Sequence, residues 1–182
     1  MAKTIYTKAK EILIAPWTTN EQGALVAPTA NSAAELAYVI ADSLSITQDD
    51  PETNDIACET SDEPLYSVTT AGKYNVELNN ASIDEDYLKN VMGWVKDGEN
   101  IIAPVSYATR YVAIQIAFTE NDRYLYLPKV QISPKLVFES LKTNIAYGTL
   151  SGTATSAKFG SEVSAKEAPI GFAKTAILTK TA

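Results

Sequence analysis

Residues 111–133 read YVAIQIAFTENDRYLYLPKVQIS, and this stretch decides the fold class. In its first part every second residue is large and apolar, namely Val112, Ile114, Ile116 and Phe118. Successive side chains of a strand point to opposite faces, so this alternation predicts a strand with one face on a core. The polar group 120–122 predicts a turn, and 124–127 and 130–133 predict further strand interrupted by Pro128. Together they indicate antiparallel pairing.

Working outward, similar patterns predict further strands at 10–15, 56–59, 64–70, 73–79 and 143–154. Residues 64–70 and 73–79 are expected to form a hairpin through an Ala71-Gly72 turn. Gly148 and Gly152 leave room for bulges or close strand crossing. Residues 173–179 fit a last strand or an arm.

The segment from Ser32 to Thr47 is open to two interpretations. Ser32-Ala-Ala-Glu35 matches a helix capping box. However, apolar residues then recur on one parity, at Leu36, Tyr38, Ile40, Leu44 and Ile46. We favour a strand over 36–47, with a helix at 32–40 as the alternative.

One helix is expected at about 83–92. Ser82-Ile-Asp-Glu85 is a capping box, and acidic residues in a first turn suit the helix dipole. Gly93 is a typical residue just beyond a helix C-terminus. The expected buried face consists of Tyr87, Leu88, Val91 and Met92.

These elements predict a mainly β protein: an antiparallel sandwich or barrel with one short flanking helix and long loops at 18–31 and 156–169. A chain of 182 residues and 19.6 kDa is most simply one domain. We expect residues 1–182 to form it, with residues 1–9 and 156–182 as terminal arm or loop segments.

Charge is concentrated in one place. Eight acidic residues and no basic ones lie between Asp42 and Glu63, in a chain of net charge −7. Residues 49–51 and 53–55 favour turns, so we expect this stretch to form the tip and flanks of a β-hairpin. This stretch is either a solvated surface or a surface that contacts a partner molecule. The candidate site residues are Asp49, Asp50, Glu52, Asp55 and Glu59.

Other charge patterns bear on partners. Residues 1–122 hold 19 acids and 7 bases, whereas 123–182 hold 3 acids and 8 bases. Such polarity favours contact between an acidic face of one copy and a basic face of another. An acidic protein is a poor general nucleic-acid binder, because affinity rests on neutralising phosphates.

The residue inventory argues against an enzyme. The chain contains no His and one Cys, which removes the common general base and the Ser-His and Cys-His nucleophilic devices. No phosphate-binding glycine motif occurs. The acidic run 49–55 lacks the glycine and the distant Glu of a calcium loop. We therefore expect no catalytic site, cofactor or metal.

The apolar run near the N-terminus is too short for a signal peptide or membrane span, so we expect a cytoplasmic protein.

Residues 36–155 carry a family resemblance. They are similar to the tail tube, or major tail, proteins of long-tailed bacteriophages and prophages of the Bacteroidales type. The motifs that carry it are SITQDDPE at 45–52, IACE at 56–59, SDEP at 61–64, Gly72, Ile83-Asp84 with Gly93-Trp94, LYLPKVQISP at 125–134, and LSGTA at 150–154.

The resemblance implies a structural virion protein. In that family a small β-sandwich or barrel flanked by a helix forms rings, typically of six copies, that stack into a hollow tube through which DNA is ejected. The acidic residues named above would then be subunit contacts or would face the lumen. Expected partners are further copies of the chain, other tail proteins, and double-stranded DNA in transit without specific binding, with no membrane. The expected location is the virion tail, with the host cytoplasm during assembly.

Two alternatives stand beside this expectation. One is another tail or contractile injection-system component on a related fold, such as a terminator, a hub or an inner tube. The other is a carbohydrate-binding β-sandwich module. The latter requires a groove of exposed aromatic residues, for which Trp17, Trp94 and the tyrosines are the candidates.

Overall fold

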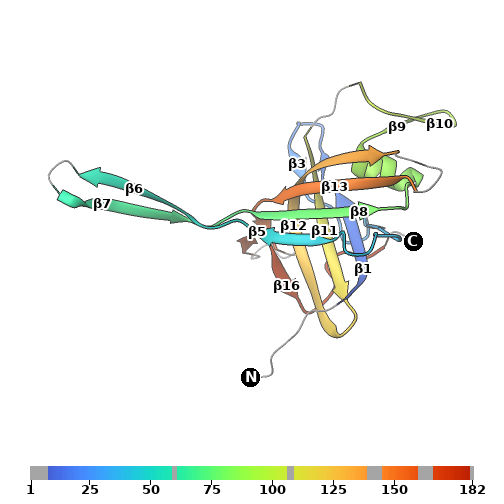
Figure 1. Ribbon diagram of the computed structural model, residues 1–182. Coiled ribbons are helices and arrows are strands. Elements are labelled where there is room, and N and C mark those ends of the chain that lie inside the picture. Colours follow the sequence, from blue (N-terminus) through green and yellow to red (C-terminus); the bar gives the residue numbers. More distant parts are fainter. Residues whose placement is uncertain (1–7, 59–60, 106–108, 139–144, 160–165, 181–182) are drawn as a thin grey trace.

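The computed structural model describes residues 8–58, 61–105, 109–138, 145–159 and 166–180. Its main element is an eight-stranded antiparallel sheet, which confirms the predicted fold class. The strand order is β4 (Ala34–Glu35), β1 (Ala9–Pro16), β11 (Arg110–Phe118), β12 (Asn121–Val137), β13 (Tyr147–Ala154), β8 (Tyr74–Asn80) and β5 (Ser45–Gln48), with β16 (Gly171–Ala173) also paired to β12. Figure 1 shows these strands gathered into one body.

The sheet bends over itself and buries its apolar residues on the inside. Strand β12 pairs with β11 and, over its second half, with β13, so it links the two halves. The fully buried side chains come from both halves and include Ile14, Val76, Leu78, Ile114, Leu127, Val130 and Leu150. The alternation predicted from the sequence therefore marks the core face in β8 and β11. The result is a sandwich-like body.

Pro128 does not interrupt its strand, contrary to the sequence expectation. Strand β12 runs from Asn121 to Val137 without a break. The register to β11 shifts between the pairs Ile114–Leu127 and Val112–Val130, which leaves one extra residue on β12. A bulge of this kind accommodates a residue without a backbone N–H. The carbonyl oxygen of Pro128 accepts a hydrogen bond from Trp17 Nε1 at 2.9 Å.

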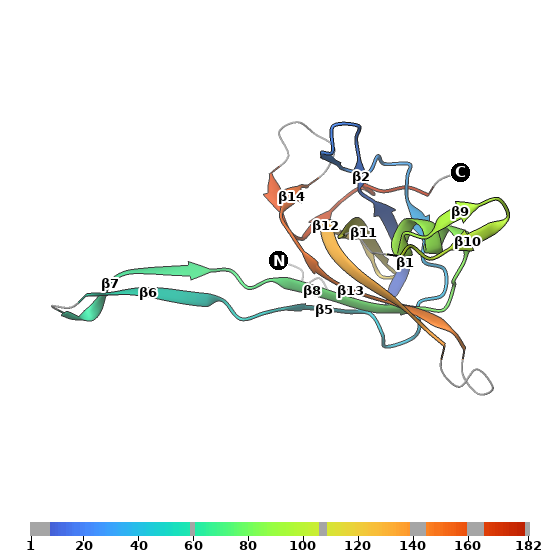
Figure 2. The ribbon, with the colours of Figure 1, turned by 90° about the horizontal axis from the view of Figure 1, so that it is seen from above.

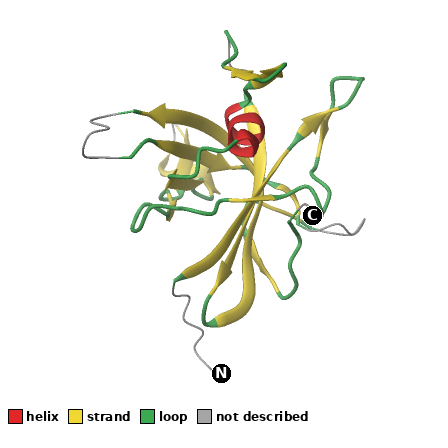
Figure 3. Cartoon of the chain, turned by 90° about the vertical axis from the view of Figure 1, so that its right-hand side faces the viewer, coloured by secondary structure: helices red, strands yellow, loops and turns green. Residues whose placement is uncertain are grey.

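The predicted helix is present but shorter and of a different type. Helix η1 (Tyr87–Met92) is a π-helix, in which hydrogen bonds reach five residues along the chain. That wider turn places Tyr87, Val91 and Met92 together on the buried face, whereas Leu88 is only half-buried. Asp84 Oδ1 accepts the Tyr87 backbone N–H at 2.7 Å, and Gly93 ends the helix with a φ of 75°. Figure 3 shows this helix beside the strands.

Gly148 lets η1 approach the sheet. The ring of Tyr87 lies where a Cβ on residue 148 would be. The glycines of β13 were expected to allow bulges or strand crossing, whereas β13 pairs with β12 and β8 without a register shift and Gly148 makes room for a helix side chain. The phenolic oxygen of Tyr87 is buried and has no hydrogen-bond partner among the described residues.

The strand expected over 36–47 is wrong. The structure has β4 at 34–35, a turn at Ile40–Ser43 and β5 at 45–48. Ser43 Oγ donates to the Ile40 carbonyl at 2.6 Å, and Asp42 has a φ of 60°. Asp tolerates this left-handed conformation better than most residues, so a turn forms inside the alternating pattern. The alternative helix at 32–40 is also absent.

The hairpin expected between 64–70 and 73–79 is wrong as well. Strand β7 (Ser61–Thr70) pairs with β6 (Glu52–Cys58), whereas β8 pairs with β5 and β13. Residues 53–55, expected as a turn, lie inside β6. Shorter ladders join β2 (Thr18–Thr19) to β3 (Leu25–Val26), β9 (Val95–Asp97) to β10 (Asn100–Ile102), and β14 (Ala157–Lys158) to β15 (Glu167–Ala168).

Residues 174–180, the C-terminal strap, lie across the outer face of β1 and β11 rather than apart from the body. Leu178 is buried there in a second apolar cluster with Leu13, Ala113 and Tyr126. The side chain of Gln115, itself buried, holds the strap: Nε2 donates to the Leu178 carbonyl at 3.0 Å, and Oε1 accepts the backbone N–H groups of Ile177 and Leu178. Lys180 forms ion pairs with Glu35 and Glu11.

Two buried tyrosines make the fold sensitive to alkali. Burial raises the pKa of Tyr87 and of Tyr126 to about 12, against about 10 for an unfolded tyrosine. Since the folded pKa is the higher one, their contribution to stability is complete below about pH 10 and is lost as the pH rises through about 12. We expect the free energy of unfolding, measured by urea denaturation, to fall steeply over this range.

Single substitutions test this assignment. Tyr87→Phe should flatten the alkaline fall, because it removes a titrating hydroxyl that has no described partner. Tyr38→Phe is the control, since Tyr38 is 69% exposed. An equal alkaline loss of stability in all three proteins would exclude Tyr87 as a cause.

Candidate functional site

Strands β6 and β7 form a hairpin that leaves the body, which we call the hairpin arm (residues 52–70). Figures 1 and 2 both show it extending well beyond the sheet. Its two strands pair with each other and with none of the other described strands. A two-stranded hairpin alone is marginally stable in water, so this arm is unusual as a free element.

The base of the arm is firmly held by the body. The backbone N–H of Asp49 donates to the Lys73 carbonyl at 2.9 Å. Asn75 Nδ2 donates to Asp49 Oδ1 at 2.8 Å. The Asp49 carbonyl also occupies the place where a Cβ on residue 72 would lie, so Gly72 is required there. Through these contacts β5 and β8 set where the arm begins.

The arm has two different faces over its described side chains. On one face Ser67 Oγ donates to Asp55 Oδ1 at 2.5 Å, and the hydroxyls of Thr53 and Thr69 share a hydrogen bond of 3.0 Å. The intervening residues point the other way. That opposite face carries three exposed apolar side chains, from Ile56 (54% exposed), Tyr66 (62%) and Val68 (42%). We call it the apolar face of the arm.

The structure distributes the predicted acidic site along this arm and does not gather it in a loop. Asp49 and Asp50 lie at the base, Glu52 and Asp55 are exposed on β6, and Glu59 lies outside the described residues. Of the residues that suggested turns, 53–55 are part of a strand because each pairs across to β7, whereas 49–51 lie between β5 and β6. Neither Asp50 nor Glu52 has an ion-pair partner in the described part of the chain.

A groove elsewhere on the body was not predicted from the sequence. It has a volume of about 580 Å³, and its lining comes from β3, β12, β14, β15 and the C-terminal strap. Its apolar lining includes Leu25, Pro128 and Ile177, and its charged lining consists of two cations, Lys129 and Lys158, and one carboxylate, Glu167. We call it the strap groove. Only the basic balance of residues 123–182 hinted at such a surface, since its residues lie far apart in sequence.

The two lysines of the strap groove are free to attract a negative partner. Lys129 Nζ lies 5.1 Å from the ring centre of Trp17 and 4.5 Å from that of Tyr111. Aromatic faces hold the ammonium group in place but do not neutralise it. Over the described ranges, neither Lys129 nor the exposed Lys158 forms an ion pair.

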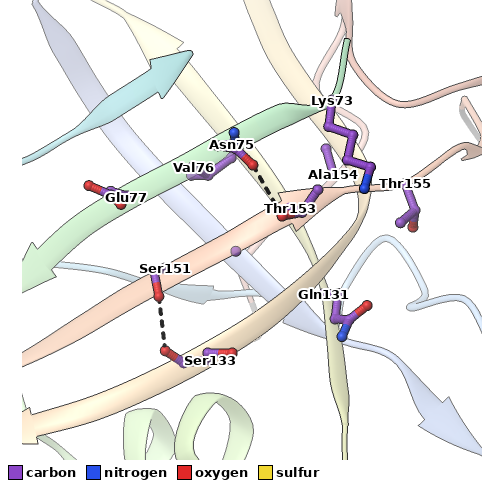
Figure 4. A pocket seen from close by; sticks show the side chains of 11 residues that line it. Lys73, Asn75, Val76, Glu77, Gln131, Ser133, Ser151, Thr153, Ala154 and Thr155 are labelled. Carbon is purple, nitrogen blue, oxygen red and sulfur yellow. Dashed lines mark hydrogen bonds between the residues drawn. The ribbon is translucent and has the colours of Figure 1, made fainter. Parts of the chain in front are cut away.

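A second hollow, of about 510 Å³, lies on the outer face of β8, β13 and β12. Figure 4 shows its small polar side chains, with Thr153 bonded to Asn75 and Ser151 to the backbone of Ser133. Its lining contains no aromatic residue. The two tryptophans are half-buried at separate places, Trp17 beneath Lys129 and Trp94 after η1. The two tryptophans therefore do not share one surface, although Trp17 and Tyr126 both line the strap groove.

Three remaining observations concern a metal site, a membrane-spanning helix and related proteins. Across the described residues, no three His, Cys, Asp or Glu side chains are grouped so as to hold a metal ion. Within the same residues, no helix is long and apolar enough to span a membrane. Comparison with known proteins finds no family model that matches the chain and no curated protein similar to it.

Proposed function

We propose that this chain is a structural protein that assembles with copies of itself into stacked rings, as the tail tube protein of a long-tailed phage does. The observation that carries the proposal is the hairpin arm, which exposes apolar side chains and packs against no other described element of its own chain. Exposed apolar patches of this kind mark interaction surfaces. The antiparallel body and the tail-tube resemblance of residues 36–155 support the same function.

The position of the acidic residues favours one of their two expected roles. Asp50, Glu52 and Asp55 lie on or beside an arm that projects from the body. A projecting element reaches a neighbouring copy more readily than it lines a smooth channel. We therefore assign these residues to subunit contact. The polar hollow on β8, β13 and β12 suits a wall that faces water and passing DNA. Its hydroxyl and amide groups are accompanied by a single cation, Lys73, and one carboxylate, Glu77, so it offers phosphates no cationic cluster.

The proposal is tested by imaging the purified protein. Negative-stain electron microscopy of the concentrated full-length chain should show rings or tubes. Light scattering after size-exclusion chromatography should give a mass that rises with protein concentration, because each added copy uses a heterologous contact. A monomer at every concentration, with no rings in the images, would refute the proposed function.

A further inference from the structure

The apolar face of the arm defines what its partner must offer. Alternation along β6 places Glu52 on the same face as Ile56, and the register places Val68 and Tyr66 across from that side of β6. This face thus presents three exposed apolar side chains and, nearer the base, one carboxylate without an ion-pair partner in the described ranges. A complementary surface needs an apolar floor with a cation at its side.

The strap groove offers both features. Leu25 is 43% exposed at its edge, and Pro128 and Ile177 add apolar lining. Lys158 is exposed at the same groove, and Lys129 lies over its aromatic rings. The other hollows match the arm less well. The one on β8, β13 and β12 is lined mainly by polar groups, and the one beside β4 holds three carboxylates, from Glu11, Glu35 and Asp42, against two lysines, Lys8 and Lys10. The strap groove, with two lysines against one carboxylate, has the opposite balance.

We propose that the apolar face of the hairpin arm of one copy docks in the strap groove of a second copy, with Glu52 meeting Lys158. This inference rests on the proposed function and names the partner site within it. The arm and the groove are different surfaces, so the contact is heterologous and continues from copy to copy. Docking covers the exposed side chains of the arm and gives its carboxylate a counter-charge.

Exchange of charge tests the pairing. Glu52→Lys alone and Lys158→Glu alone should each raise the protein concentration needed for assembly by about tenfold, because each places like charges together. The double variant should restore assembly close to that of the parent. Glu120→Lys makes the same change in net charge at an exposed site away from the arm and should have little effect. Circular dichroism spectra should show that all variants are folded.

Cross-linking between two differently labelled batches tests the contact itself. In a Cys58→Ser background, one batch carries Val68→Cys on the apolar face of the arm, and the other carries Leu25→Cys in the groove. A short bismaleimide should join the two batches into a mixed dimer. Ser67→Cys is the matched control, since its side chain lies on the opposite face of the arm, and its yield should be several-fold lower.

The outcomes separate this inference from the function on which it rests. Normal assembly by both single charge variants, or equal cross-linking from positions 67 and 68, would overturn the docking site while rings in the parent sample keep the function. Joining of two Val68→Cys arms to each other would show arm-to-arm pairing and would also overturn it. Failure of the parent protein to form any oligomer would refute the proposed function first.

Discussion

Removal of residues 51–71 should produce a folded protein that no longer assembles. The deletion joins Asp50 directly to Gly72, and Asp49 is already hydrogen-bonded to Lys73. Asp-Gly is a favoured two-residue hairpin turn, so β5 and β8 would be connected by a suitable loop. The described arm side chains are all exposed, and none belongs to the apolar core. The free energy of unfolding should therefore change by only about 1 kcal/mol or less.

The loss of assembly should in contrast be complete. Without the arm, light scattering should report a monomer at concentrations where the parent chain forms rings, and electron micrographs should show no tubes. Replacement of Ile56 and Val68 by Ser is a milder companion, which keeps the hairpin and removes most of its apolar face. Rings of normal appearance from the arm-less chain would mean that the body alone makes the contacts. Loss of the folded state would mean that the arm supports the sheet.

Replacement of Gln115 by Leu should be the most destabilising of the substitutions considered. Gln115 is 1% exposed and makes three hydrogen bonds to the backbone of Ile177 and Leu178. Leu has a similar size but leaves two N–H groups and one carbonyl of the strap unpaired. Each buried polar group left unpaired costs about 1–3 kcal/mol. We expect the free energy of unfolding to fall by about 3–5 kcal/mol. The fall stays below the full sum because the strap can detach and leave its polar groups in water.

Two measurements check this expectation. Urea denaturation gives the free energy of unfolding, and limited proteolysis with trypsin reports whether the backbone at Lys174 and Lys180 has become accessible. Gln131→Leu is the matched control, because Gln131 is exposed on the outer face of β12. A loss below about 1 kcal/mol, with unchanged proteolysis, would show that Gln115 does not hold the strap.

The sequence predicted the body better than the arm, for a physical reason. In β8 and β11, alternation is imposed by a core that accepts only one face of each strand. Strand β6 has no core to face, so its residues Glu52–Asp55 keep the composition of a turn while pairing with β7. The pattern at 36–47 failed because Ile40–Ser43 makes a local turn that alternation cannot reveal. In η1, the predicted capping box does not form, because Ser82 Oγ bonds Asp84 and it is Asp84 that accepts the Tyr87 N–H. Nothing in the sequence pattern distinguishes a π-helix from an α-helix.

The candidate site was likewise predicted only in part from the sequence. Its acidic residues were recognisable because they lie within eleven consecutive positions, 49–59. The strap groove was not, because its lining comes from β3, β12, β14, β15 and the C-terminal strap, which only the fold brings together. Side chains so far apart in sequence leave no local pattern.

The C-terminal strap also orders events during synthesis. A ribosome makes the chain from its N-terminus, so the hairpin arm at 52–70 emerges long before Ile177 and Leu178, which line the strap groove. A nascent chain therefore carries an arm before it has a place to receive one. On the proposed docking, two unfinished chains on one messenger RNA cannot link to each other through this pair of surfaces, because neither has yet formed the groove. The proposed docking would then require at least one subunit whose strap has closed over β1 and β11, which would keep polymerisation to finished subunits.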